Sequence, residues 1–291
     1  MKFTLRKNLT VAAFVLPALI PLAVFWIWPI FNAAYISLTN WDYMTAEYDF
    51  VAFRQYEKLL SSGEFHKALL NTLVFCAASA VLTIAGGLGL ASLLHRGFRG
   101  SGLFRALFFS PWITPTVAVS LVWMWIFDEK NGIANAVIGL FGLPALKWVG
   151  SSATAMLAVI IVTVWKSVGY AMVFYLTALD KVPKSLYEAA ALDRASRRQS
   201  FFWITLPCIS PTTFFLAVVT TINGLQAYDQ IQILTQGGPA GSTRTLLYLY
   251  YQLGFEKYDM GRASALAVTL LLLCIALSFA QNLISKRMVH Y

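Results

Sequence analysis

The chain has 291 residues, of which 58% are hydrophobic and 12% are charged, and its formal net charge is +9. Soluble globular domains are typically about 45–50% apolar and about 25% charged, so this composition argues against a water-soluble fold and indicates a polytopic membrane protein. The positive charge does not indicate a nucleic-acid partner, because the charged residues cluster at the ends of apolar runs. The three cysteines and three histidines are isolated from one another, so no metal site is expected.

Five stretches without Asp, Glu, Lys or Arg are long enough to cross a bilayer, which takes about 20 apolar residues per helix. A sixth stretch is apolar except for Lys166. We therefore expect an all-α integral membrane protein that forms a single transmembrane domain over residues 1–291. The predicted spans cover about residues 9–36, 68–94, 105–127, 152–179, 207–228 and 263–285.

The first span follows Lys2, Arg6 and Lys7, as the apolar core of a signal peptide would. Its apolar run is much longer than the roughly 7–15 residues of such a core, so we interpret it as an uncleaved span. We expect its prolines to kink it; they are Pro17, Pro21 and Pro29.

Six spans place both termini on one side of the membrane. If that side is the cytoplasm, the inner segments hold 13 Lys and Arg residues against three acids, whereas 9 cations and 10 acids remain elsewhere. This asymmetry predicts cytoplasmic termini by the positive-inside rule. Several tryptophans then fall near the outer interface of the membrane; they are Trp26, Trp28, Trp41, Trp123, Trp125 and Trp148. An aromatic belt at the interface accounts for them, although each ring is also able to stack on a sugar.

The predicted outer loops cover residues 39–67, 128–150 and 229–262, and residues 128–132 read as a turn. Glycines in the second span are expected to permit close helix packing; they are Gly86, Gly87 and Gly89.

Lys166 lies near the middle of the fourth predicted span. A charge at that depth is costly and usually faces a cavity or a partner group. Two interpretations are open: Lys166 lines the pathway and binds solute hydroxyls, or it is a structural cation bound to carbonyls or an acid of a neighbouring helix.

Residues 180–206 form a polar, basic segment between the fourth and fifth spans. Ser185 precedes Glu188 by three residues, and Ser196 precedes Gln199 by three, and both spacings are typical of a capping box at a helix start. We expect two short helices joined by a turn near residues 193–194, with the fifth span beginning at residue 207. The segment is either a docking element for a soluble partner or a solvated loop.

The sequence Glu-Ala-Ala at residues 188–190, followed by Asp193 and by Leu-Pro at residues 206–207, resembles the EAA loop of ABC importer permeases. Residues 104–112, 165–170 and 234–239 resemble further segments of the carbohydrate branch of that family, the maltose and glycerol-3-phosphate type. The resemblance covers nearly the whole chain.

The resemblance implies a type I importer fold in the bacterial cytoplasmic membrane. Its partners would be a second homologous permease, two ATP-binding cassette subunits, an extracytoplasmic solute-binding protein and the lipid bilayer. The chain has no phosphate-binding loop of its own, so ATP would be hydrolysed by the partner, and we expect no enzymatic activity and no cofactor here. Residues expected to couple to the ATPase are Glu188, Ala189, Ala190, Asp193, Arg194 and Ala195.

Arg194 departs from the family pattern, which usually has glycine after the aspartate. Glycine there would permit a left-handed turn, and any other residue in that conformation costs about 1–2 kcal/mol. Either the turn differs here, or contacts of Arg194 offset the strain; an extra cation would also favour an acidic patch on the ATPase.

The outer half of the chain offers weaker candidates for solute and partner contact. Polar residues near the outer end of the fifth span are able to meet a sugar, although helix-end polarity explains them equally well; they are Asn223, Gln226, Tyr228 and Asp229. The tight turn at Gly237, Gly238 and Pro239 is implied by the resemblance to contact the binding protein or the pathway mouth.

We therefore expect a permease subunit that forms half of the pathway of an ATP-driven, binding-protein-dependent importer for a sugar or oligosaccharide. An importer of glycerol-3-phosphate-type organophosphates is the alternative. A secondary transporter is disfavoured because no acid lies inside a span, and a membrane enzyme because its motifs are missing.

Overall fold

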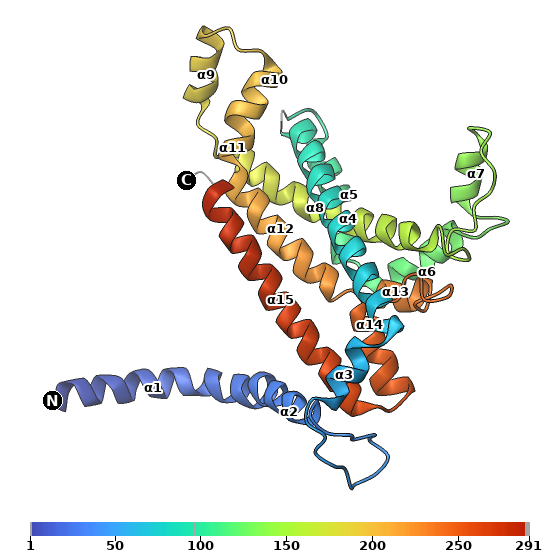
Figure 1. The fold of residues 1–291 in the computed structure, drawn as a ribbon. Coiled ribbons are helices and arrows are strands. Elements are labelled where there is room, and N and C mark those ends of the chain that lie inside the picture. Colours follow the sequence, from blue (N-terminus) through green and yellow to red (C-terminus); the bar gives the residue numbers. More distant parts are fainter. Residues whose placement is uncertain (1, 96, 289–291) are drawn as a thin grey trace. The chain divides into compact units, whose positions relative to one another are not determined.

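The computed structural model describes residues 2–95 and 97–288, which are mostly helical (Figure 1). The chain divides into two compact units. The first unit holds the residues up to Ser62 together with Tyr250–Leu272, and the second holds Gly63–Leu249 and the residues from Leu273 onward. The described residues form no strand, apart from an isolated bridge between Thr39 and Phe50. The predicted all-α fold class is confirmed.

Helices account for most of the described chain. In chain order they are α1 (Lys2–Leu22), the π-helix η1 (Ala23–Ile27), α2 (Trp28–Ile36), α3 (Arg54–Leu60), α4 (Gly63–Leu94), α5 (Ser101–Ile113), α6 (Thr116–Ile126), α7 (Ile133–Gly139), α8 (Ala155–Asp180), α9 (Lys184–Leu192), α10 (Arg197–Ser200), the π-helix η2 (Phe201–Thr205), α11 (Leu206–Cys208), α12 (Ser210–Leu225), α13 (Asp229–Leu234), α14 (Leu246–Tyr251), the π-helix η3 (Gln252–Glu256) and α15 (Met260–Met288).

Four of the described helical stretches are long and apolar enough to cross a membrane on their own, and two further pairs of bent helices would raise that number to six. The four are Ala13–Ile36, Gly63–Leu94, Ala155–Asp180 and Met260–Leu283.

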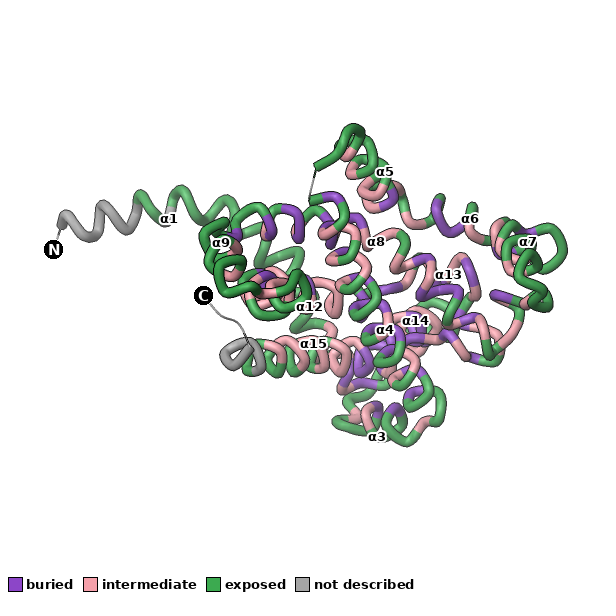
Figure 2. Tube along the Cα trace, turned by 90° about the horizontal axis from the view of Figure 1, so that it is seen from above, coloured by how far each residue is buried: buried purple, intermediate pink, exposed green. Residues whose placement is uncertain are grey.

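In the first unit, no residue of the stretch Ala13–Ile36 is buried, and most of them are exposed (Figure 2). Large apolar side chains such as Phe14 and Trp26 lie in the open, at 82% and 71% of their full surface. The helix continues through Pro17 and Pro21 and changes to π geometry directly after them, at η1. An apolar helix that is exposed in this way within its own unit is suited to contact with lipid or with another membrane subunit.

The chain that follows α2 is fixed to α3 and to the start of α15, all within the first unit. The buried Gln55 amide donates to the Thr39 carbonyl at 2.9 Å, and the Gly261 amide donates to the Trp41 carbonyl at 2.9 Å. A β-carbon at Gly261 would overlap the Thr39 carbonyl oxygen. This position therefore requires glycine because two backbone segments meet there.

The core of the second unit lies where α4, α8 and α12 pack together (Figure 2). Its buried residues include Tyr175 and Met172 of α8 and Leu216 of α12. A β-carbon at Gly87 of α4 would lie 2.5 Å from that of Ala171, so the small residue permits the close approach that the sequence predicted. A β-carbon at Gly89 would meet no other part of the described chain within 4 Å, so the predicted packing role is not seen at Gly89 among the described residues.

Two of the spans predicted as continuous helices are broken. The predicted span over residues 105–127 is divided into α5 and α6, which meet at 103°. Thr114 between them is extended, with φ −78° and ψ 137°. Pro115 explains the break, because it has no N–H for the preceding turn and disfavours helical geometry at the residue before it.

The predicted start of the fifth span, at Pro207, lies close to a bend. Pro207 lies within the segment Arg197–Cys208, and α12 begins at Ser210 after a bend of 63°; the two segments are long and apolar enough to cross a membrane only when taken together. Pro211 in the first turn of α12 accounts for the bend, because its ring clashes with the carbonyl four residues earlier.

Candidate functional site

The segment over residues 180–206 folds into a helix pair, α9 followed by α10, as the sequence predicted. The pair lies at the end of the second unit that is remote from α13 (Figure 1). The Tyr187 and Thr205 hydroxyls form a 2.8 Å hydrogen bond that ties α9 to η2. Glu188, Ala189 and Asp193 are exposed, so both acids and the first alanine of the segment are open to a partner, whereas Ala190 is half-buried.

One of the two predicted capping boxes is present. The Ser196 hydroxyl accepts a hydrogen bond from the Gln199 amide, and the Gln199 side chain accepts one from the Ser196 amide, at the start of α10. The box predicted at Ser185 and Glu188 was wrong. The cap of α9 is Pro183, in extended geometry, so Ser185 is already inside the first turn and is unable to cap it.

Arg194 adopts the left-handed conformation that glycine usually provides, with φ 56°. Its amide donates to Ala191 at 3.1 Å, and the Ala195 amide donates to Ala190 at 2.9 Å. This pair of bonds is the Schellman motif that ends a helix. The turn is therefore kept despite the substitution, and no hydrogen bond or ion pair of the Arg194 side chain within the described chain offsets its strain.

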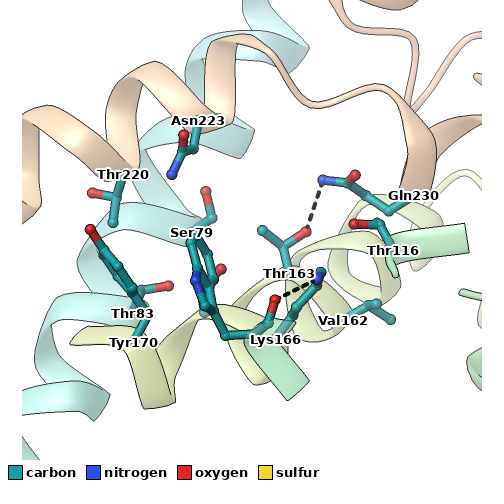
Figure 3. Close-up of a pocket in the computed structure, with 13 residues that line it drawn as sticks. Ser79, Thr83, Thr116, Val162, Thr163, Lys166, Tyr170, Thr220, Asn223 and Gln230 are labelled. Atoms are coloured by element: carbon teal, nitrogen blue, oxygen red, sulfur yellow. Dashed lines mark hydrogen bonds between the residues drawn. The ribbon is translucent and has the colours of Figure 1, made fainter. Parts of the chain in front are cut away.

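A second candidate site is a cavity of about 280 Å³ in the middle of the second unit. Figure 3 shows polar side chains pointing into it from α4, α6, α8, α12 and α13. The lining residues that carry hydroxyl or amide groups are Ser79, Thr83, Thr116, Thr163, Ser167, Tyr170, Thr220, Asn223 and Gln230.

Aromatic rings close one side of this cavity. Trp112 and Tyr170 are stacked, with centroids 4.4 Å apart and planes 26° from parallel. On the opposite side, the Gln230 amide donates to the Thr163 hydroxyl at 3.4 Å (Figure 3). A polar cavity with an aromatic face is suited to a ligand that carries both hydroxyl groups and apolar C–H faces.

Lys166 lines the same cavity, but its ammonium group is bound to backbone. The Nζ atom donates to the carbonyls of Thr114 at 2.7 Å, Trp112 at 3.2 Å and Pro111 at 3.4 Å. It also lies 5.9 Å from the centroid of the Trp112 ring. The bonds to carbonyls agree with the interpretation of Lys166 as a structural cation. Its position in the cavity lining agrees with the interpretation of Lys166 as a residue of the pathway.

The predicted pathway residues are only partly brought together. Asn223 lines the cavity with Lys166, whereas Gln226 and Asp229 are exposed and do not line it. Sequence reasoning missed most of the lining, including Thr163 and Gln230. Those residues come from segments far apart in the chain, and no local spacing relates them.

The predicted turn at residues 237–239 is held firmly within the second unit. The Lys67 ammonium donates to the Ala240 carbonyl at 2.7 Å, and the Asn71 amide donates to Gly241 at 2.9 Å and to Arg244 at 3.0 Å. Gly237 has φ 74°, and a β-carbon there would lie 2.6 Å from the Tyr248 ring. The loop is therefore a defined surface at the start of α4.

The long apolar helices, the polar cavity within the second unit and the exposed helix pair are features of an α-helical membrane permease. Residues 83–290 match the family described as the binding-protein-dependent transport system inner membrane component. The chain belongs to this family and is a permease subunit of an ABC importer.

Relatives of known name support the assignment of the chain to this family. The chain is 33% identical over 278 residues to the sn-glycerol-3-phosphate transport system permease protein UgpA of Pectobacterium atrosepticum, covering 95% of this chain and 94% of that one. It is 33% identical over 274 residues to the multiple sugar-binding transport system permease protein MsmF of Streptococcus mutans serotype c, covering 94% of each.

The fold is also found among solved structures. A chain of a bacterial alginate ABC transporter, solved in complex with alginate pentasaccharide-bound periplasmic protein, superposes with a TM-score of 0.85. The two chains are 22% identical, and the match covers 99% of this chain and 97% of that one. This likeness confirms the predicted permease fold.

Proposed function

We propose that this permease subunit forms half of the pathway of an importer for a neutral sugar or oligosaccharide. The observation that carries the proposal is the lining of the central cavity, which combines hydroxyl and amide groups with the stacked Trp112 and Tyr170 rings. Sugars present hydroxyls at their rim and C–H groups on their faces, and such a lining meets both.

A glycerol-3-phosphate ester is the alternative, supported by the relative UgpA. A phosphate group is best bound by converging Arg or Lys donors. Among the described lining residues the one cation is Lys166, and each of its three N–H groups has a backbone carbonyl within reach. The two relatives are equally identical to this chain, so the proposal of a neutral solute is supported by the chemistry of the cavity alone.

We further propose that α9 and α10 form the coupling element that docks on the ATP-binding cassette subunit, which hydrolyses ATP on behalf of this chain. The contact residues would be Glu188, Ala189, Ala190, Asp193, Arg194 and Ala195. Glu188 is exposed, and Leu192 is exposed to 86% of its full surface. These observations support the proposal, because an exposed surface that combines an acid with a large apolar side chain is suited to contact with a protein partner.

The topology follows from the same proposal. The whole chain would form a single transmembrane domain of six spans, two of them broken, with both termini and the helix pair in the cytoplasm, because the basic residues gather on that side. A second homologous permease would complete the pathway. The extracytoplasmic solute-binding protein would dock near residues 237–239.

Uptake by whole cells tests the proposed solute. Deleting the gene and restoring it on a plasmid should abolish and recover the uptake of at least one labelled neutral sugar, while uptake of labelled sn-glycerol-3-phosphate should not change. The reverse result would overturn the neutral-solute proposal in favour of the organophosphate alternative.

Charge reversal at Glu188 tests the proposed docking. Glu188→Arg should abolish both transport and copurification of the ATPase subunit, whereas the matched reversal Glu47→Arg, on an exposed residue of the 39–67 loop, should leave both unchanged. Wild-type transport by the Glu188→Arg protein would exclude the proposed contact.

A further inference from the structure

The break between α5 and α6 removes backbone hydrogen bonds inside the second unit. In a continuous helix the Pro111 carbonyl would accept from the amide of residue 115, but Pro115 has no N–H. The carbonyls at the end of α5 also carry the partial negative charge of a helix C-terminus. The bend therefore gathers acceptors at one point. The Thr114 amide donates to the Pro111 carbonyl at 3.3 Å, and the other donors of the interrupted turn have to come from outside α5 and α6.

Lys166 of α8 supplies these donors. An ammonium group has three N–H donors and no acceptor, and three carbonyls of the break lie within 3.4 Å of Nζ, those of Pro111, Trp112 and Thr114. The number of donors matches the number of acceptors, so no donor of Lys166 is left for a solute in this conformation.

The approach of α5 to α8 is set one turn further along α8. A β-carbon at Gly169 would overlap the carbonyl oxygen of Phe108, so only glycine permits this distance. Residues three apart share one face of a helix. The end of α5 therefore packs against the face of α8 that carries Lys166 and Gly169.

The residues on both sides of the break belong to the cavity wall. Trp112 precedes the break and stacks on Tyr170, and Thr116 follows it. If the break were released, these two side chains would lose their fixed positions.

We infer that Lys166 is a positioning residue: it latches the broken helix α5–α6 to α8 and so holds Trp112 and Thr116 in place for the solute, without binding the solute itself. This inference rests on the proposed function for its effect on transport, but the latch itself is testable without any solute.

The experiment uses the assembled transporter in nanodiscs, with Cys76, Cys208 and Cys274 replaced by alanine and a single cysteine introduced by Thr116→Cys. The rate at which a small thiol reagent labels position 116 reports the mobility of the break. Lys166→Met should speed labelling by about tenfold, roughly what the loss of one hydrogen bond to a charged group produces. Lys166→Arg, which keeps several donors, should stay within about threefold of the parent. Lys147→Met, in the exposed 128–150 loop, is the matched control and should have no effect.

Transport by the same Lys166 variants with native Thr116 separates positioning from assembly and from solute binding. Per assembled complex, Lys166→Met should raise the solute concentration for half-maximal uptake by about tenfold, and Lys166→Arg should restore it. Unchanged labelling and an unchanged half-saturation in assembled Lys166→Met protein would overturn the latch, and so would an arginine variant as impaired as the methionine one.

If the methionine variant does not assemble, Lys166→Gln replaces it, with the same expected changes in labelling and uptake. If the glutamine variant also fails to assemble, the labelling rate of the arginine variant is the test, and a tenfold increase in that rate would overturn the inference. If no sugar is transported by any form while labelling behaves as expected, the proposed solute is wrong and the latch stands.

Discussion

Replacing Arg194 by glycine should stabilise the turn between α9 and α10. Arg194 has φ 56°, and its amide and that of Ala195 close the end of α9. Left-handed geometry costs a residue with a side chain about 1–2 kcal/mol, which the glycine variant avoids. Glycine has greater conformational freedom when the turn is open, and this offsets about 0.5–1 kcal/mol of that gain. The net gain is therefore about 1 kcal/mol, or about a fivefold change in the local opening equilibrium.

Hydrogen exchange of peptides that contain residues 194–196 measures this equilibrium. Arg194→Ala is the matched control, because it removes the charge and keeps the strain. After correction for intrinsic rates, the amides of residues 194 and 195 should exchange about fivefold more slowly in the glycine variant than in the alanine variant. Equal or faster exchange in the glycine variant would refute the assignment of strain to Arg194.

Two further perturbations test the packing around the proposed sites. Gly169→Ala should lower the free energy of unfolding by about 2 kcal/mol, because the added carbon overlaps the Phe108 carbonyl. The matched control Gly89→Ala should not lower it, because there is open space around Gly89. Equal melting temperatures of the two variants in detergent would contradict the predicted contact. Asn71→Ala removes the donor to the Gly241 carbonyl and should increase hydrogen exchange of residues 237–244 severalfold, and an unchanged pattern would show that Asn71 does not hold this loop.

The continuous helices could be predicted from the sequence because the bilayer imposes a length and a composition on each span. α4, α8 and α15 follow directly from their apolar runs. The break at Pro115 was missed, although the signal was present, because apolarity was counted and the effect of proline on the preceding Thr114 was not. The failed capping box at Ser185 has a similar cause, since Pro183 sets the helix start two residues earlier.

The cavity could be predicted only in fragments. Lys166 and Asn223 are conspicuous as polar residues in or beside apolar runs, and both line it. Thr163 and Gln230 are ordinary residues in their local sequence, and their convergence depends on the tilt and packing of α8 and α13. Long-range geometry of this kind is fixed by tertiary contacts, which no spacing within one segment encodes.

The claim that this cavity carries a neutral sugar is tested most directly by solute protection of a cysteine inside it. In the cysteine-free transporter, Asn223→Cys places a thiol in the lining, and Gln226→Cys places a control thiol on an exposed residue outside it. The transported sugar should slow labelling at position 223 and not at position 226, and sn-glycerol-3-phosphate should protect neither. Protection at position 223 by sn-glycerol-3-phosphate alone, or equal labelling at both positions with and without sugar, would contradict the account.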